Sequence, residues 1–210
     1  MHMSLSLPVL YAIIDPARSC GRRPAVVARD LLSAGVQVIQ LRDKKASCRE
    51  LYETCVELTA LLGAFGCILI VNDRTDVARA VDAGGVHLGQ NDLPVEMARR
   101  ILGPEKWIGC SANLLSQVIE ADRSAADYIG FGPIFPTASK DDADPVVGLE
   151  GLRQARKATR KPLVAIGGIT LENAPQVLAA GADSVAVIGD LLSAPDIQAR
   201  AREFLSVLRP

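Results

Sequence analysis

The stretch LVAIGGITLENAPQVLAAGADSVAVIG, residues 163–189, contains two short apolar runs on either side of a segment with helical spacing. The runs at 163–168 and 184–189 are apolar throughout rather than alternating, which is typical of parallel strands covered by helices. Residues 173–180 have the spacing of a helix, and Gly181 suits the left-handed position that often follows a helix. The stretch therefore predicts a strand, a helix and a second, parallel strand.

The same unit recurs along the whole chain. Similar apolar runs occur at 9–14, 36–41, 67–71, 85–88, 107–111 and 128–132. Helical segments lie between them: Pro24 suits the first turn of one, and Ser47 with Glu50 fits a capping box at the start of another. Residues 150–158 and 196–208 also have helical spacing. Like Gly181, three more glycines are expected to end helices in the left-handed conformation: Gly35, Gly63 and Gly84.

Eight strand–helix units predict a single (β/α)8 TIM barrel, smaller than the usual ~250 residues and therefore with short loops. We expect one catalytic domain over residues 1–210, with residues 1–7 as a ragged N-terminus. The alternative is a doubly wound open sheet. That fold would hold fewer strands in its sheet, and no GxGxxG dinucleotide motif follows the first strand.

The composition argues against several classes of protein. The 210 residues are 49% hydrophobic, enough for one buried core, and the formal net charge of −1 gives no electrostatic reason to expect nucleic acid or an anionic membrane as a partner. The five cysteines form no CxxC pair, so neither a disulfide nor a zinc framework is predicted. No apolar run approaches the ~20 residues of a membrane span, and the first residues do not resemble a signal peptide. A cytoplasmic protein is expected, and a homo-oligomer is possible.

Polar residues gather at the carboxyl ends of the predicted strands, where TIM barrels place their active sites. Asp73 and Asp92 follow neighbouring strands, and two carboxylates completed by water and phosphate oxygens commonly hold Mg²⁺. Each also has an ordinary alternative, since Asp73 suits a turn and Asp92 suits the N-cap of the next helix. In a barrel the two carboxylates would face one mouth, which favours a shared magnesium site.

Three basic residues belong to the same rim. Arg42, Lys44 and Lys140 would supply positive charge to phosphate oxygens, unless each is an ordinary solvated loop charge. Gln40 is an amide within an apolar strand and needs a hydrogen-bond partner in a dry core. His87, also within a strand, is interpreted as a structural, hydrogen-bonded histidine, with a catalytic base as the alternative.

A second group of residues suits a phosphate. The glycine-rich strand ends at 167–168 and 188–189 would expose backbone N–H groups after the seventh and eighth strands, where these barrels usually bind phosphate. Thr137 and Ser139 would add hydroxyl donors to the same anion. One metal-assisted anion site and one site of amides and hydroxyls together suggest two phosphorylated small-molecule reactants.

These residues lie in motifs that resemble the thiamine phosphate synthase family, in the family's order and over nearly the whole chain. The motifs are QLRDK (40–44), NDR (72–74), GVHLGQND (85–92), the region of Ser111, GPIFPTASK (132–140), VGLEGL (147–152) and IGGI (166–169). The resemblance implies a Mg²⁺-dependent transferase that joins 4-amino-2-methyl-5-hydroxymethylpyrimidine diphosphate to a thiazole phosphate or its carboxylate. The products would be thiamine phosphate and pyrophosphate.

The resemblance also implies individual roles. The pyrimidine diphosphate would bind Gln40, Leu41, Arg42, Asp43, Lys44, Asn72, Ser111 and Lys140. Of these, the catalytic residues that stabilise the leaving diphosphate would be Arg42, Lys44 and Lys140. The thiazole phosphate would bind Thr137, Ala138, Ser139, Gly168, Ile188 and Gly189. One Mg²⁺ would be held by Asp73 and Asp92.

The chain departs from the family's usual residues at three positions: Ser139 in place of threonine, Gly189 in place of a common serine, and Asn113 in place of a frequent histidine. These departures bear on thiazole affinity more than on the reaction. A related thiazole tautomerase is one alternative, but it has no need of two carboxylates together with QLRDK. A non-catalytic barrel that senses a phosphorylated metabolite is the other, and the charges expected at the mouth argue against it.

Overall fold

The computed structural model describes residues 7–137 and 145–209, and within them eight parallel strands close into a barrel. The strands are β1 (Leu10–Ile14), β2 (Val38–Leu41), β3 (Ile68–Asn72), β4 (Gly85–Leu88), β5 (Trp107–Ala112), β6 (Tyr128–Phe131), β7 (Leu163–Ile166) and β8 (Ser184–Val187). Each strand pairs with the next, and β8 closes the ring on β1, where Val185 lies opposite Leu10. The predicted TIM barrel is confirmed, and the alternative of a doubly wound sheet is wrong.

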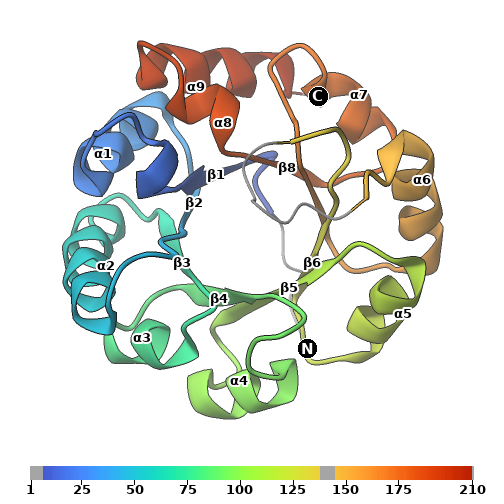
Figure 1. Cartoon of the computed structure of the whole chain (residues 1–210), viewed down its shortest axis with the longest axis horizontal. Coiled ribbons are helices and arrows are strands. Elements are labelled where there is room, and N and C mark those ends of the chain that lie inside the picture. Colours follow the sequence, from blue (N-terminus) through green and yellow to red (C-terminus); the bar gives the residue numbers. More distant parts are fainter. Residues whose placement is uncertain (1–6, 138–144, 210) are drawn as a thin grey trace.

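Helices surround the strands as an outer ring (Figure 1). In the described ranges they are η1 (Pro16–Arg18), α1 (Pro24–Ala34), α2 (Cys48–Gly63), α3 (Thr75–Ala80), α4 (Val95–Leu102), α5 (Leu115–Arg123), α6 (Gly148–Ala158), α7 (Ala174–Ala179), α8 (Gly189–Leu192) and α9 (Ile197–Val207). Pro24 is the first residue of α1, and Ser47 and Glu50 form the predicted capping box of α2. Among the described residues, no helix is both long and apolar enough to cross a membrane.

Two of the four glycines expected to end helices do so. Gly35 follows α1 and Gly181 lies two residues after α7, with φ of 98° and 110°. The expected left-handed conformation is wrong for Gly63, the last residue of α2, and for Gly84, because neither has a positive φ. A Cβ at Gly84 would lie 2.5 Å from Cγ2 of Ile68, so this glycine makes room for the neighbouring strand.

The barrel interior contains polar as well as apolar side chains. Tyr11 on β1 and Tyr128 on β6 are fully or almost fully buried, and their hydroxyls are 2.8 Å apart although their strands are not neighbours. Both rings therefore point into the barrel. Gln40 on β2 is also buried and donates to the Tyr11 hydroxyl. This is the partner that the sequence required for an amide in a dry core.

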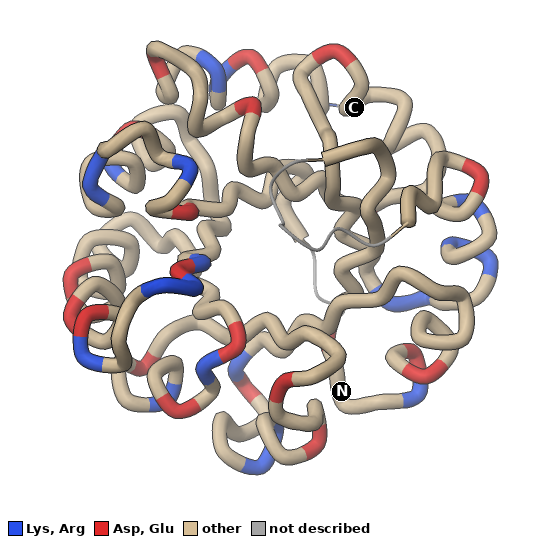
Figure 2. Tube along the Cα trace, in the orientation of Figure 1, with Lys and Arg blue, Asp and Glu red and all other residues tan. Residues whose placement is uncertain are grey.

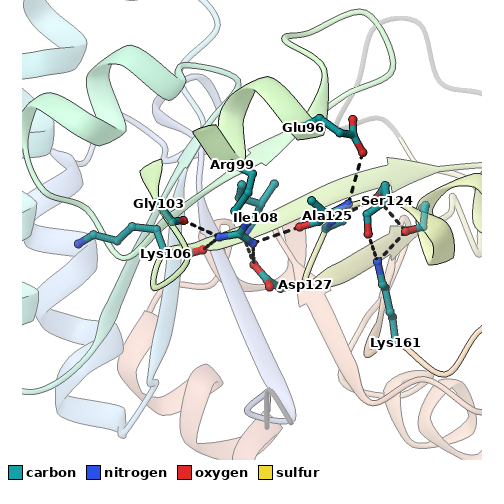
Figure 3. A network of polar contacts seen from close by, with 11 residues as sticks. Glu96, Arg99, Gly103, Lys106, Ile108, Ser124, Ala125, Asp127 and Lys161 are labelled. Atoms are coloured by element: carbon teal, nitrogen blue, oxygen red, sulfur yellow. Dashed lines mark hydrogen bonds and ion pairs between the residues drawn. The ribbon is translucent and has the colours of Figure 1, made fainter. Parts of the chain in front are cut away.

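A polar network holds the amino-terminal ends of the strands, away from the mouth. The guanidinium of Arg99 on α4 donates to the carbonyls of Gly103, Lys106 and Ala125 and forms an ion pair with Asp127 at 2.6 Å (Figure 3). Asp127, just before β6, also accepts from the backbone N–H of Ile108 at 2.7 Å. One arginine and one carboxylate thus tie a helix to two neighbouring strands.

The same arrangement recurs two strands further on. Arg156 on α6 donates to the carbonyls of Thr159 and Lys161 and forms an ion pair with Asp183 at 2.8 Å. Asp183, just before β8, accepts from the backbone N–H of Leu163 at 2.7 Å. Each carboxylate satisfies a strand N–H that would otherwise lack a partner and neutralises the arginine that reaches it.

Candidate active site

A cavity of about 790 Å³ opens among the loops that follow the later strands. Its size lies within the ~300–1,000 Å³ range of small-molecule sites. The residues expected from the sequence that line it are Ser111, Thr137, Gly168, Ile188 and Gly189. Asn113, the position of one family departure, lines the same wall. Residues far apart in the sequence are therefore brought together around one space.

The loop after β6 packs tightly against the end of β7. The N–H of Phe135 donates to the carbonyl of Gly167 at 3.0 Å. Gly168 has a φ of 61°, and a Cβ on it would lie 2.4 Å from the carbonyl oxygen of Pro136. Only glycine permits this close approach, which brings Thr137 to the cavity wall. Ala138, Ser139 and Lys140 lie outside the described residues.

The last strand contributes a wall of backbone groups. Ile188 directly follows β8, and Gly189 begins the short helix α8. Asp190 accepts from the backbone N–H of Leu171 at 2.8 Å, and Asn173 donates to the carbonyl of Gly168 at 2.9 Å. The first bond joins the loop after β7 to α8, which follows β8, and the second holds the loop after β7 together. The glycine-rich wall is therefore fixed by polar contacts.

Charged residues gather on the other side of the mouth. Figure 2 shows most charges on the outer ring of helices and a further group at the inner rim on the left, near the ends of β1, β2 and β3. Lys44 forms an ion pair with Asp73 there, and Arg42 pairs with Asp15 at 2.6 Å. The mouth therefore has a charged side and a glycine-rich side.

Asp73 has an unusual conformation and an unusual environment. Its φ is 62°, in the left-handed region that Asp tolerates better than most residues, and its N–H donates to the carbonyl of His87 at 2.8 Å. Burial raises the pKa of Asp73, and the adjacent carboxyl of Asp92 raises it further, while Lys44 opposes both effects. The two aspartates are thus close enough to interact and carry negative charge that one lysine only partly compensates.

Asp92 closes a loop rather than capping a helix. Its Oδ2 accepts from the N–H of Gly89 at 2.6 Å, whereas α4 begins at Val95 with Pro94 at its N-cap position. The N-cap alternative for Asp92 is therefore wrong. No group of three or more acidic, histidine or cysteine side chains that could hold a metal occurs among the described residues. A pair of carboxylates is nevertheless a donor set that fits Mg²⁺, which usually keeps waters and substrate oxygens as its other ligands.

Asp15 is a residue of the site that the sequence did not reveal. It directly follows β1, is 3% exposed, and its Oδ1 accepts from the N–H of Ala17. Its Oδ2 holds the guanidinium of Arg42, which is itself largely buried. Because planar guanidinium groups offer five N–H donors, this bond fixes Arg42 and leaves other donors for a substrate. The only sequence signal was an Asp-Pro pair directly after an apolar run.

His87 is hydrogen-bonded through both ring nitrogens. Nε2 lies 2.9 Å from Oγ of Ser111, and Nδ1 lies 3.3 Å from the hydroxyl of Tyr128. The carbonyl of Ser111 accepts a hydrogen bond from the side-chain amide of Gln90. Gln90 also lines the cavity, and the sequence had not singled it out as a site residue. Asn72 ends β3 opposite His87 and is half-buried. His87 and Asn72 thus lie between the charged rim and Ser111.

Two residues expected in the site have mainly local contacts. Leu41 is 1% exposed and belongs to the hydrophobic core. The Oδ1 of Asp43 accepts from the N–H groups of Lys45 and Ala46, both at 3.0 Å. Leu41 thus packs the end of β2 into the core, and the side chain of Asp43 shapes the loop that carries Arg42 and Lys44.

A closed eight-stranded barrel with its polar groups at the carboxyl ends of the strands has the architecture of the TIM-barrel enzymes. Residues 10–191 match the family model described as thiamine monophosphate synthase. The chain is 48% identical to the thiamine-phosphate synthase of Koribacter versatilis (99% of each chain covered) and 46% identical to that of Chloroflexus aurantiacus (95% of this chain, 92% of that protein). The chain belongs to the thiamine monophosphate synthase family.

The solved structures agree with this assignment. The thiamine phosphate pyrophosphorylase from Pyrococcus furiosus superposes with a TM-score of 0.86 at 38% identity, over 95% of each chain. Several other barrels superpose at much lower identity, including a native KDPGal structure with a TM-score of 0.72 at 16% identity. These more distant likenesses concern the fold alone.

Proposed function

We propose that this protein joins 4-amino-2-methyl-5-hydroxymethylpyrimidine diphosphate to 4-methyl-5-(2-phosphoethyl)thiazole, or its carboxylate, giving thiamine phosphate and pyrophosphate. The observation that carries the proposal is the divided mouth. On one side the interacting carboxylates of Asp73 and Asp92 adjoin Lys44; on the other, Gly168 and Gly189 line a cavity of about 790 Å³. The first side suits a diphosphate with a divalent cation, and the second suits a phosphate monoester.

The pyrimidine diphosphate would bind on the charged side. Arg42 and Lys44 reach its phosphate oxygens, and Lys140 joins them from the loop after β6. Gln40, Asn72 and Ser111 are suited to the pyrimidine ring, because amides and hydroxyls can match its amino group and ring nitrogens. Leu41 and Asp43 contribute through the backbone of the loop.

The thiazole phosphate would bind on the glycine-rich side. Backbone N–H groups at Gly168, Ile188 and Gly189 are suited to its phosphate, together with hydroxyl donors from Thr137 and Ser139 and the backbone of Ala138. A glycine at 189 supplies only its backbone N–H. Phosphate affinity on this side then depends more on the threonine and serine hydroxyls.

The chemistry demands little proton transfer. Loss of pyrophosphate from the pyrimidine methylene leaves a delocalised cation, which the thiazole nitrogen captures. Arg42, Lys44 and Lys140 stabilise the negative charge that grows on the departing diphosphate. The two anion sites also hold the reactants close together, and orientation of this kind can supply ~7–11 kcal/mol in favourable cases.

Asp73 and Asp92 would hold one Mg²⁺. The carboxylate of Asp92 raises the pKa of the neighbouring Asp73, so a cation between them would relieve their repulsion, and the ion pair with Lys44 already offsets part of it. When bound, the ion would supply further positive charge to the diphosphate oxygens. We also propose one catalytic domain, a cytoplasmic location and small molecules as the partners, with neither nucleic acid nor membrane involved.

A coupled assay for thiamine phosphate formation tests the function. With both substrates and Mg²⁺, we expect thiamine phosphate and pyrophosphate in equal amounts, and loss of both products when EDTA removes the metal. Each substrate is also incubated alone, because a thiazole tautomerase would act on the thiazole phosphate without the diphosphate. Turnover of the thiazole alone, with no product from the pair, would refute the proposal.

A matched pair of variants tests the metal site. Asp73→Ala should abolish the magnesium-dependent rate. Asp76→Ala removes a carboxylate three residues away that pairs with the exposed Arg74, and should leave the rate unchanged. If both variants lose activity equally, the effect is not due to the proposed metal site.

A further inference from the structure

A continuous chain of hydrogen bonds crosses the barrel beneath the mouth. It runs from Gln40 to the hydroxyl of Tyr11 (3.0 Å), from Tyr11 to the hydroxyl of Tyr128 (2.8 Å), and from Tyr128 to Nδ1 of His87 (3.3 Å). The other ring nitrogen of His87 reaches Oγ of Ser111 at 2.9 Å. The chain therefore joins two residues proposed to bind the pyrimidine, through three that have no such assignment.

The first bond sets the direction of the chain. The side-chain N–H of Gln40 donates a hydrogen bond to the Tyr11 oxygen. The Tyr11 hydroxyl can then donate its own hydrogen bond to the oxygen of Tyr128. Burial raises the pKa of both tyrosines, so each keeps its proton. A buried hydroxyl needs an acceptor for that proton, and for Tyr128 the acceptor in this direction is Nδ1 of His87.

The consequence for His87 is a fixed tautomer. A ring nitrogen that accepts a hydrogen bond carries no proton, so Nδ1 is the acceptor and Nε2 carries the proton. Nε2 then donates to Oγ of Ser111. Because the Ser111 oxygen accepts from His87, its own proton points elsewhere, and Ser111 lines the cavity.

We propose that Tyr128 is a positioning residue: its hydroxyl holds His87 as the Nε2–H tautomer, and His87 in turn presents Ser111 as a hydrogen-bond donor to the pyrimidine diphosphate. The role of Ser111 rests on the proposed function, whereas the tautomer does not. The bond to Tyr11 uses one N–H of the Gln40 amide and leaves its carbonyl oxygen and its second N–H for a ligand. Gln40 would thus offer an acceptor, and Ser111 a donor, to the pyrimidine, which carries an amino group and ring nitrogens.

The tautomer can be measured without any substrate. The chain has only two histidines, so ¹⁵N-histidine labelling with a His2→Gln variant leaves His87 as the one imidazole signal. Long-range ¹H–¹⁵N spectra at mildly alkaline pH should show a single Nε2–H tautomer. Tyr128→Phe, which removes the donor to Nδ1, should yield a mixture or a switch to Nδ1–H.

Tyr11→Phe is the matched control. It deletes a hydroxyl from the same buried cluster but leaves Tyr128 able to donate to His87, so the single Nε2–H tautomer should persist. An Nδ1–H tautomer in the unaltered chain would overturn the proposal, because the chain of bonds would then run the other way. An unchanged tautomer in Tyr128→Phe would overturn it as well.

Kinetics separate positioning from structural support. We expect Tyr128→Phe to raise KM for the pyrimidine diphosphate roughly fivefold, the equivalent of one neutral hydrogen bond, with KM for the thiazole phosphate unchanged. Ser111→Ala should raise the same constant, and the double variant should be no worse than Ser111→Ala alone. Additive losses, or equal changes in both KM values, would refute the positioning role.

The two proposals fail in different ways. If the unaltered protein forms no thiamine phosphate, the proposed function fails, and the tautomer experiment still reports on Tyr128 and His87. If the protein is active but the double variant behaves additively, the function stands and the positioning role is wrong.

Discussion

Removing Asp127 should cost a substantial part of the stability of the barrel. Its Oδ2 accepts from Arg99 at 2.6 Å and from the N–H of Ile108 at 2.7 Å. Hydrogen bonds to charged groups contribute about 1.5–3 kcal/mol each. The side chains of Asp127 and Arg99 are 29% and 20% exposed, so solvent screens part of this, and we expect Asp127→Ala to lower the free energy of unfolding by about 2–4 kcal/mol.

A graded set of variants tests the cause of that loss. Asp127→Asn keeps an oxygen for Ile108 but loses the charge that faces Arg99, so it should cost about half as much. Glu57→Ala removes a carboxylate that is 46% exposed and pairs with the exposed Arg23, and should cost less than about 1 kcal/mol. The variants therefore separate a partly buried ion pair from a surface one.

Urea unfolding followed by far-UV circular dichroism gives the free energies, and thermal unfolding provides a check. For a chain of this length, about 2–4 °C in Tm corresponds to each kcal/mol, so Asp127→Ala should melt roughly 10 °C lower. If Asp127→Ala costs no more than Glu57→Ala, the carboxylate does not stabilise the barrel in the way described.

Four further outcomes are expected. Asp73→Ala should abolish magnesium-dependent turnover while circular dichroism shows an intact fold; pyrophosphate release with normal metal dependence would contradict the metal site. Burial and Asp92 raise the pKa of Asp73, so Mg²⁺ affinity measured by calorimetry should fall as pH drops, with a midpoint above the usual aspartate value of 3.8. Lys140→Ala should lower kcat more than it changes KM for the thiazole, and a purely thiazole-side effect would argue against its place on the diphosphate. Gly168→Ala places a Cβ against the carbonyl of Pro136 at a φ of 61°, so it should raise KM for the thiazole phosphate severalfold; an unchanged KM would show that the loop adjusts.

The strands could be predicted from the sequence because a parallel strand covered on both faces must be apolar throughout. The first run was expected at 9–14 and the strand is Leu10–Ile14; the run expected at 184–189 becomes the strand Ser184–Val187. Helix ends were harder. Gly63 and Gly84 have the sequence context of a helix end, yet Gly84 is determined by the nearness of Ile68, a contact that exists only in the folded barrel.

The partners of the polar residues could not be predicted in the same way. Asp15 meets Arg42 because the ends of β1 and β2 become neighbours, with the N–H of Arg42 donating to the carbonyl of Ile14 at 2.9 Å. Tyr11 and Tyr128 are 117 positions apart and meet only when the barrel closes. Their strands look apolar in the sequence, so nothing local distinguishes an inward tyrosine that forms a hydrogen bond from one that packs as a hydrophobic ring.

The repeated arginine–aspartate pairs before β6 and β8 lie at the opposite end of the strands from the cavity. Effects of substitutions at distant sites without shared partners usually add. Substitutions can therefore change the substrate preference and the stability of this chain independently. When substitutions in the cavity wall lower stability, an added ion pair at the amino-terminal end should restore it. A variant with a new substrate preference therefore need not be selected from a more stable parent.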